Sequence, residues 1–363
     1  MSLKEDLDNL ELISAIDSFK MANALESAPK HYEGAFKLAE NFDVEWLKNK
    51  EFLNIVFLGM GGSSIGGSLL RDWCYEDMVL PIDVCRDSII PGYLNSKTLV
   101  FAVSYSGNTK ETLDSFSLAL KKGCTIISLS SGGLLEEYCL RFNVKHIKVP
   151  SGFQPRLALP YLFIPPALIL EKLGLIKGFK SEFMEALNTL RGLSEDLKPS
   201  TSTNRNEAKI LALNLKGKLP VIYGFRWFNS VAYRWKTQLN ENSKVFCKYD
   251  VLPELNHNEV VGWENINPSL LNLLSIILLR DKDEPLEIKV RIEILKEILV
   301  EKTEKIFEVY GKGEKKLSKM LSAIYIGDYV SFYLAILNRI NPTPVKTISI
   351  LKRELEKRLK TQD

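Results

Sequence analysis

The sequence predicts an α/β protein with two doubly wound parallel sheets and flanking helices. Short apolar, β-branched segments alternate with amphipathic segments in both halves of the chain, as in right-handed βαβ units. The length of 363 residues allows two domains, each with its own core. In open parallel sheets ligands bind beyond the carboxyl ends of the strands, so a site is expected at those ends.

The first half of the chain, residues 1–155, is expected to form one sheet domain. Residues 1–50 have helical spacing and few helix breakers. Further helices are expected at Ser64–Trp73 and Lys110–Lys121, between strands. The expected strands are Asn54–Leu58, Pro81–Val84, Thr98–Val103, Cys124–Leu129 and Lys145–Val149.

The remainder of the chain divides into a helical segment and a second alternating series. Residues 156–215 show no strand candidates, and we expect a helical connection there. Residues 216–363 should form the C-terminal sheet domain, closed by helices at Lys315–Arg339 and Pro344–Lys360. The elements expected before them are strand Lys218–Tyr223, helix Trp227–Leu239, strand Ser243–Cys247, strand Leu271–Arg280, helix Glu287–Leu299 and strand Glu304–Val309.

Composition argues against several classes of partner. The 48 basic and 45 acidic residues give a net charge of +3, which offers no reason to propose nucleic acid or an acidic membrane. Apolar stretches at Leu157–Leu170 and Leu270–Leu279 are interpreted as core, since the first contains three prolines and the second is about half a membrane span. The five cysteines are widely spaced and the N-terminus is charged, so we expect a reduced, cytoplasmic compartment.

The most informative turn is the run Ser-Tyr-Ser-Gly-Asn-Thr between an expected strand and an expected helix. Its hydroxyls, Ser104, Ser106 and Thr109, lie where unpaired helix amides would favour a phosphate. The alternative is a capping box, with Asn108 as the N-cap and Glu111 reaching back to it. Capping does not explain three hydroxyls together, and the local pattern leaves the two interpretations evenly balanced.

A glycine-rich turn, Gly59–Gly67, follows the first expected strand. It is close to the dinucleotide pattern G-x-G-x-x-G, but Ser64 occupies the third glycine position. We therefore expect no nucleotide cofactor. The glycines permit a ligand to approach the backbone, which makes Gly61, Gly62 and Ser63 candidate contacts; the alternative is a tight turn for close helix–strand packing.

Three further side chains could perform chemistry. Glu241 lies between two asparagines at the end of an expected helix, where a solvated helix end is the commoner interpretation. His257 lies in a polar loop rich in Asn and Glu and could transfer protons, although most loop histidines are surface residues. Arg156 follows a strand and could face the same cleft. The three histidines have no metal-ligand spacing, so no metal is expected.

Together these motifs resemble the two-domain sugar isomerase fold, and within it the archaeal-type bifunctional phosphoglucose/phosphomannose isomerases. The resemblance covers nearly the whole chain, and six motifs in the same order are highly specific. They are G-M-G-G-S at Gly59–Ser63, S-Y-S-G-N-T at Ser104–Thr109, P-R at Pro155–Arg156, N-E-N-S-K at Asn240–Lys244, P-E-x-N-H-N-E at Pro253–Glu259 and P-T-P-V-x-x-I-x-x-L-K at Pro342–Lys352.

The resemblance implies an isomerase that interconverts glucose 6-phosphate and fructose 6-phosphate, and also mannose 6-phosphate and fructose 6-phosphate. Glu241 would move a proton between C1 and C2, and Arg156 would stabilise the enediolate-like intermediate. His257, supplied by the neighbouring subunit of a homodimer, and Lys352 would assist ring opening, with Lys352 alternatively on the phosphate side. The residues implied for the phosphate are Gly61, Gly62, Ser63, Ser104, Ser106 and Thr109.

The chain departs from the family at Ser64, where glycine is usual, and this serine could narrow the loop beside the ligand. Thr343 lies near the region linked to tolerance of mannose 6-phosphate. Two other functions are weighed against the isomerase: an aminosugar-phosphate isomerase, and a non-catalytic sugar-phosphate sensor. A sensor would need the phosphate-binding loops but not Glu241, His257 and Lys352.

Overall fold

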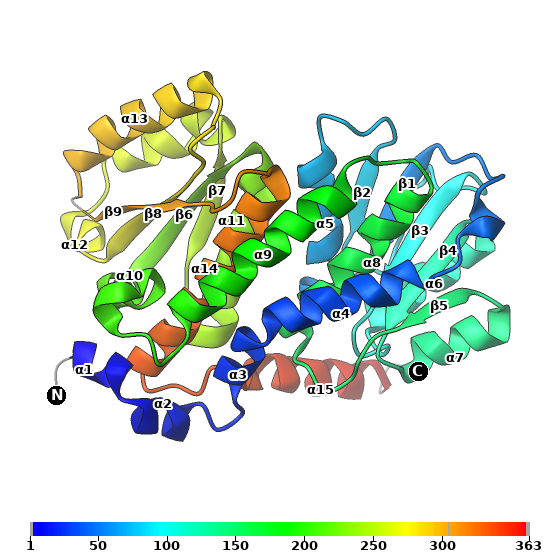
Figure 1. Cartoon of the computed structure of the whole chain (residues 1–363), viewed down its shortest axis with the longest axis horizontal. Helices are drawn as coiled ribbons and strands as arrows, with labels where there is room; N and C mark the ends of the chain where they lie inside the picture. Colours follow the sequence, from blue (N-terminus) through cyan, green and yellow to red (C-terminus); the bar gives the residue numbers. More distant parts are fainter. Residues whose placement is uncertain (1–2, 304, 361–363) are drawn as a thin grey trace.

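The computed structural model describes residues 3–303 and 305–360, and contains two parallel β-sheets in separate lobes (Figure 1). The N-terminal sheet has the strand order β2-β1-β3-β4-β5, and every neighbouring pair is parallel. This confirms the expected doubly wound arrangement. Its strands are β1 Asn54–Leu58, β2 Ile82–Cys85, β3 Thr98–Val103, β4 Thr125–Ser130 and β5 Lys145–Lys148.

The C-terminal sheet is also parallel, with the order β7-β6-β8-β9. The expected strand at Ser243–Cys247 is wrong, because a π-turn at Leu239–Ser243 prolongs the preceding helix. Lys244 then reverses the chain with a left-handed φ of 55°. The strands are β6 Leu219–Phe225, β7 Lys248–Leu252, β8 Leu274–Arg280 and β9 Ile306–Tyr310.

Helices cover both faces of both sheets, which explains why the central strands are buried on both sides, whereas the edge strands carry charged residues. In the N-terminal lobe, Ile55 and Phe57 join the main core, while Val56 and Leu58 join a second core beneath the outer helices. The helices before the second sheet are α1 Leu3–Asp8, α2 Leu10–Ile16, α3 Met21–Glu26, α4 Ala28–Glu40, α5 Ile65–Cys74, α6 Lys110–Lys121, α7 Gly133–Phe142, α8 Leu159–Lys172, α9 Phe179–Leu197 and α10 Glu207–Leu215.

The later helices are α11 Asn229–Gln238, α12 Pro268–Leu271, α13 Leu286–Val300, α14 Lys316–Leu337 and α15 Lys346–Lys360. Helix α14 packs against α9, α10 and α11 in the centre of the molecule (Figure 1). It is the one described helix long and apolar enough to cross a membrane, with a mean hydropathy of 1.6, and its apolar window is wholly buried in the fold. A helix that is apolar all round is typical of a protein core.

Helix α15 lies at one edge of the molecule. It leaves the middle of the fold and runs beneath the N-terminal lobe toward α7 (red in Figure 1). Four of its described apolar residues are exposed: Ile348 at 41%, Ile350 at 51%, Leu351 at 68% and Leu355 at 50%. These residues form an apolar surface on the described chain.

Gly66 permits the close approach of α5 to α8. A Cβ at Gly66 would lie 2.6 Å from the Leu162 carbonyl oxygen, which belongs to the backbone of α8. Gly192 on α9 offers a contrast, since a Cβ there would have open space.

We expect Gly66→Ala to lower the free energy of unfolding by about 1–3 kcal/mol, because the two helices must move apart. Gly192→Ala should raise it by about 0.5–1 kcal/mol, because alanine reduces the backbone entropy of the unfolded chain. Urea titration followed by circular dichroism measures both. Equal effects of the two substitutions would contradict the role given to Gly66.

Candidate active site

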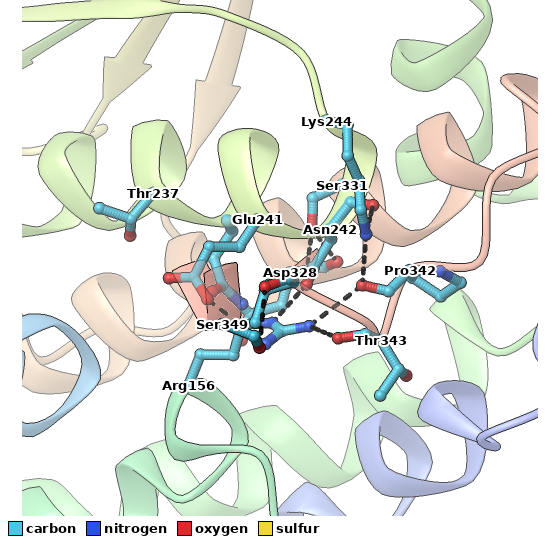
Figure 2. A network of polar contacts seen from close by, with 12 residues as sticks. Arg156, Thr237, Glu241, Asn242, Lys244, Asp328, Ser331, Pro342, Thr343 and Ser349 are labelled. Atoms are coloured by element: carbon cyan, nitrogen blue, oxygen red, sulfur yellow. Dashed lines mark hydrogen bonds and ion pairs between the residues drawn. The ribbon is translucent and has the colours of Figure 1, made fainter. Parts of the chain in front are cut away.

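Arg156 is the point at which the two lobes and the C-terminal segment meet. It lies in a 3-10 turn, Pro155–Leu157, just after the N-terminal sheet, and is only 3% exposed. Its Nε donates to Asn242 Oδ1 at 2.6 Å and its Nη1 lies 3.3 Å from Glu241 Oε2. Its Nη2 donates to the Thr343 and Pro342 carbonyls at 2.7 and 3.0 Å (Figure 2).

Burial and the neighbouring carboxylate have opposite effects on the protonation of Arg156. Burial lowers the pKa of Arg156 from its usual range, whereas the Glu241 carboxylate favours the charged form. A buried charge is tolerated where its hydrogen-bonding groups are satisfied. Each of the three guanidinium nitrogens has at least one acceptor, so the group is fixed in a single orientation.

A second buried ion pair holds the backbone of Arg156. Arg234 on α11 donates to the Arg156 carbonyl at 3.0 Å and to Asp328 Oδ2 on α14 at 2.8 Å. Gln238 donates to the other oxygen of Asp328 at 2.9 Å. Burial raises the pKa of Asp328, while the neighbouring Arg234 opposes that rise. The two central helices thus position the turn that carries Arg156.

Glu241 lies in the π-turn at the end of α11. Its side chain is 27% exposed and lines a cavity of about 620 Å³, together with residues of the first turns of α15. Asn242, next in the turn, accepts from Arg156 and donates to Ser331 Oγ on α14 at 2.9 Å. Single π-turns are frequent at functional sites. Glu241 is therefore a carboxylate beside a buried cation on a cavity wall, not an ordinary solvated helix end.

Two turns of the N-terminal lobe, Gly59–Gly67 and Ser104–Thr109, lie against each other and are called the polar turns. Ser63 Oγ accepts from the Tyr105 amide at 3.1 Å, and Ser104 Oγ donates to Thr109 Oγ1 at 3.0 Å. Ser104 is fully buried, whereas Ser106 is exposed. The first turn also abuts the Arg156 turn.

Close packing around these turns depends on two glycines, of which Gly62 faces the Arg156 turn and Gly107 faces the turn after β4. A Cβ at Gly62 would lie 3.0 Å from the Pro155 carbonyl carbon and 3.1 Å from the Arg156 amide nitrogen. At Gly107 the φ is +70°, and a Cβ would lie 1.7 Å from the Gly132 carbonyl oxygen. The polar turns, Arg156 and Glu241 therefore form one continuous structure.

The alternative of a capping box headed by Asn108 does not form. Thr109 is the N-cap of α6, and its amide donates to Ser104 Oγ at 3.4 Å. The side-chain oxygen of Asn108 accepts from the Leu134 amide at 3.0 Å, in the turn after β4. Asn108 joins two neighbouring turns because tertiary contacts offer it a partner that the local sequence does not show.

Ser64 is fully buried beneath the glycine-rich turn. Its Oγ donates to the Gly61 carbonyl at 2.9 Å and accepts from Arg86 Nε at 3.0 Å. The serine therefore ties the turn to Arg86 and occupies no space on the exposed side of the turn. The expectation that it narrows the loop is not supported.

His257 and Glu241 lie at opposite ends of β7. Glu241 precedes the strand, and His257 follows it in an exposed 3-10 turn, Glu254–His257. Five strand residues span about 16 Å. Within one chain, the fold does not bring the imidazole to the carboxylate.

Lys352 is exposed on α15, one turn beyond Ser349. Ser349 lines a second cavity of about 520 Å³ with Gln154 and Thr343. Residues three apart on a helix share a face, so Lys352 continues the face that borders this cavity.

The sequence interpretation missed several residues that hold the site. Arg234, Asp328 and Ser331 were not singled out, although an acidic residue within a largely apolar helix was an available signal for Asp328. Asn242 and Lys244 stood within a quoted motif without an assigned role. No three His, Cys, Asp or Glu side chains gather around a common ion position in residues 3–303 and 305–360.

The chain is similar in sequence to known proteins over most of its length. The C-terminal SIS domain of bacterial phospho-glucose isomerase matches residues 204–355. The bifunctional phosphoglucose/phosphomannose isomerase of Caldicellulosiruptor bescii is 41% identical over 336 residues, covering 92% of this chain and 98% of that protein. The bifunctional phosphoglucose/phosphomannose isomerase of Aquifex aeolicus is 35% identical, over 90% of this chain and 99% of its own.

A crystal structure of a hypothetical protein from Thermus thermophilus has the same fold. It superposes with a TM-score of 0.73 at 17% identity, covering 96% of this chain and 94% of the other. At this identity the likeness establishes the fold, with two parallel-sheet lobes and flanking helices.

We expect Gly107→Ala to weaken the stabilisation of the protein by inorganic phosphate. Gly123 is the matched control, because its φ of +73° imposes similar strain while a Cβ there would lie 4.0 Å from its nearest neighbour, Ser96 Cβ. Both variants should lose stability, by about 1–2 kcal/mol from the left-handed conformation alone. Only Gly107→Ala should also lose the rise in melting temperature with added phosphate. A normal rise in melting temperature with phosphate in Gly107→Ala would contradict phosphate binding by the Ser104–Thr109 turn.

Proposed function

Because the chain belongs to the bifunctional phosphoglucose/phosphomannose isomerase family, we propose that it interconverts glucose 6-phosphate and fructose 6-phosphate, and mannose 6-phosphate and fructose 6-phosphate. The observation that carries the proposal is the pairing of Glu241 with the buried Arg156 on a cavity wall, next to the polar turns. A base, a fixed cation and an anion-binding turn are the groups that this reaction needs.

Aldose–ketose isomerisation moves one carbon-bound proton between neighbouring carbons. In the open-chain aldose, Glu241 takes the proton from C2, and the electron pair forms the enediolate as the carbonyl oxygen gains negative charge. Returning the proton to C1 gives the ketose, while the hydroxyl proton passes from O2 to O1. One carboxylate can serve both steps because C1 and C2 are adjacent. A positioned base contributes about 10²–10⁴-fold to the rate.

Arg156 supplies the electrostatic part of the proposed mechanism. Its guanidinium is already oriented by Asn242 and the 342–343 carbonyls, so little reorganisation accompanies the appearance of the oxyanion. The polar turns would hold the unreactive phosphate. Binding energy from that end fixes C1 and C2 beside Glu241.

Ring opening is assigned to His257 and Lys352, with His257 coming from a second subunit. The separation of His257 from Glu241 along β7 supports this arrangement, since a two-fold partner can present the loop to the opposite site. The exposed apolar residues of α15 are available for contact between subunits. The proposal therefore includes a homodimer. It also places the protein in the cytoplasm, where its five free cysteines remain reduced.

Glu241→Gln should lower kcat for fructose 6-phosphate by about 10²–10⁴-fold with little change in KM, because the amide keeps the shape but cannot accept the proton. A coupled assay with a chelator present measures this. Glu297→Gln, at an exposed position of α13, is the control and should match the wild type. Retention of most of kcat by Glu241→Gln would show that another group is the base.

The shared site can be tested by mixing two inactive proteins. His257→Ala and Glu241→Gln subunits are unfolded together and refolded. Each mixed dimer has one site with both native groups, so random pairing should restore about a quarter of the wild-type activity. The separately refolded variants are the controls. Failure to recover activity in verified mixed dimers would argue against a site built from two subunits.

A further inference from the structure

Lys244 directly follows the turn that carries Glu241 and lines the same cavity. Its Nζ donates to the carbonyls of Asn242 at 3.1 Å and Pro342 at 3.0 Å (Figure 2). It also donates to the Asn341 carbonyl at 2.9 Å. All three acceptors are neutral backbone oxygens. The ammonium therefore joins the end of the π-turn to a segment about a hundred residues later in the chain.

The Pro342 carbonyl is shared between two cations. It accepts from Lys244 Nζ and from Arg156 Nη2, both at 3.0 Å. The 341–343 turn is thus held between Lys244, three residues after Glu241, and Arg156. Displacement of this turn would change the acceptors of Arg156 and the position at which α15 begins.

We propose that Lys244 is a positioning residue for the isomerase reaction, which clamps the 341–343 turn and so fixes Arg156 relative to Glu241. This role rests on the proposed function and deepens it. Lys244 acts through backbone carbonyls and takes no proton from the sugar.

The charge on Lys244 gives the clamp a dependence on pH. Lys244 is an exposed residue, but its ammonium is packed against three carbonyls. This partial burial and the nearby Arg156 lower the pKa of Lys244 to about 8, and Glu241 opposes the shift. Lys346 is a further charged side chain lining the cavity. As pH rises through 8, Lys244 loses its charge and one N–H donor, so the clamp weakens and kcat should fall.

The same shift has the opposite effect on stability. The folded state holds the Lys244 proton less tightly than the unfolded state, so between pH 8 and the ordinary pKa of 10.5 this group makes folding more favourable as pH rises. Above pH 8, kcat should therefore fall while deprotonation of Lys244 does not lower the free energy of unfolding. This difference distinguishes loss of the clamp from general loss of structure.

The test compares Lys244→Met, Lys244→Arg and Lys172→Met. Lys172 is the matched control, since its Nζ also donates to three backbone carbonyls, those of Ala39, Glu40 and Phe42. It lies at the end of α8 remote from Arg156, and the 14 residues of that helix span about 20 Å. The kcat and KM for fructose 6-phosphate are measured from pH 6 to about pH 10, with thermal unfolding at each pH.

Lys244→Met should lower kcat by about 10- to 10²-fold with little change in KM, and should lose the alkaline fall near pH 8. Lys244→Arg should recover much of kcat and keep it above pH 8, because arginine stays charged. Lys172→Met should match the wild type in both respects. The positioning role of Lys244 is overturned if the wild type is active and Lys244→Met has the same kcat and the same alkaline fall.

Two further outcomes are distinguishable. If Lys244→Met does not fold, the arginine variant decides: an unchanged alkaline fall near pH 8 in Lys244→Arg overturns the role of Lys244. If the wild type and Lys172→Met are both folded and inactive on fructose 6-phosphate, the proposed function itself fails, and the positioning role fails with it.

Discussion

The structure depends on the burial of one guanidinium. Arg156 loses nearly all contact with water, and a charge in that position is stable only when its donors are satisfied by well-placed acceptors. Asn242 and Glu241 come from the second lobe, and the 342–343 carbonyls come from the segment before α15. The pairing requirement of a single side chain therefore fixes how the two lobes and the C-terminal helix meet.

The two lobes contribute different groups to the candidate site. The polar turns belong to the N-terminal lobe, whereas Glu241 belongs to the C-terminal lobe. Neither lobe contains both the polar turns and Glu241. Arg156 positions them relative to each other, because it pairs with Glu241 and packs against the Gly62 backbone. The buried pair of Arg234 and Asp328 gives this junction a rigid support on the two central helices. The geometry of the site is therefore a property of the interface between lobes.

Local sequence patterns were sufficient for most of the fold. Strands β1 and β3 were predicted at their observed bounds, because their short length, their β-branched and aromatic residues and the turn residues beside them favour strands buried on both faces. The strand expected at Ser243–Cys247 failed because a π-turn there is stabilised by Asn242 contacts with Arg156 and Ser331, which lie far away in sequence. The motifs singled out Glu241 and Arg156. The charge of Asp328 within an apolar helix signals a buried polar contact, but its pairing with Arg234 arises from helix packing that the local sequence does not show.

The reach of Arg156 along the chain also bears on biosynthesis. Its Nη2 binds the carbonyl of Thr343, 187 residues later. A ribosome makes the whole N-terminal sheet long before that acceptor exists, and domains generally fold as they emerge. In the nascent chain the guanidinium must stay hydrated at the edge of a lobe that is otherwise complete. The turn bearing Arg156 can reach its dehydrated state only after Thr343 has left the ribosome, so the candidate site forms later than the N-terminal sheet.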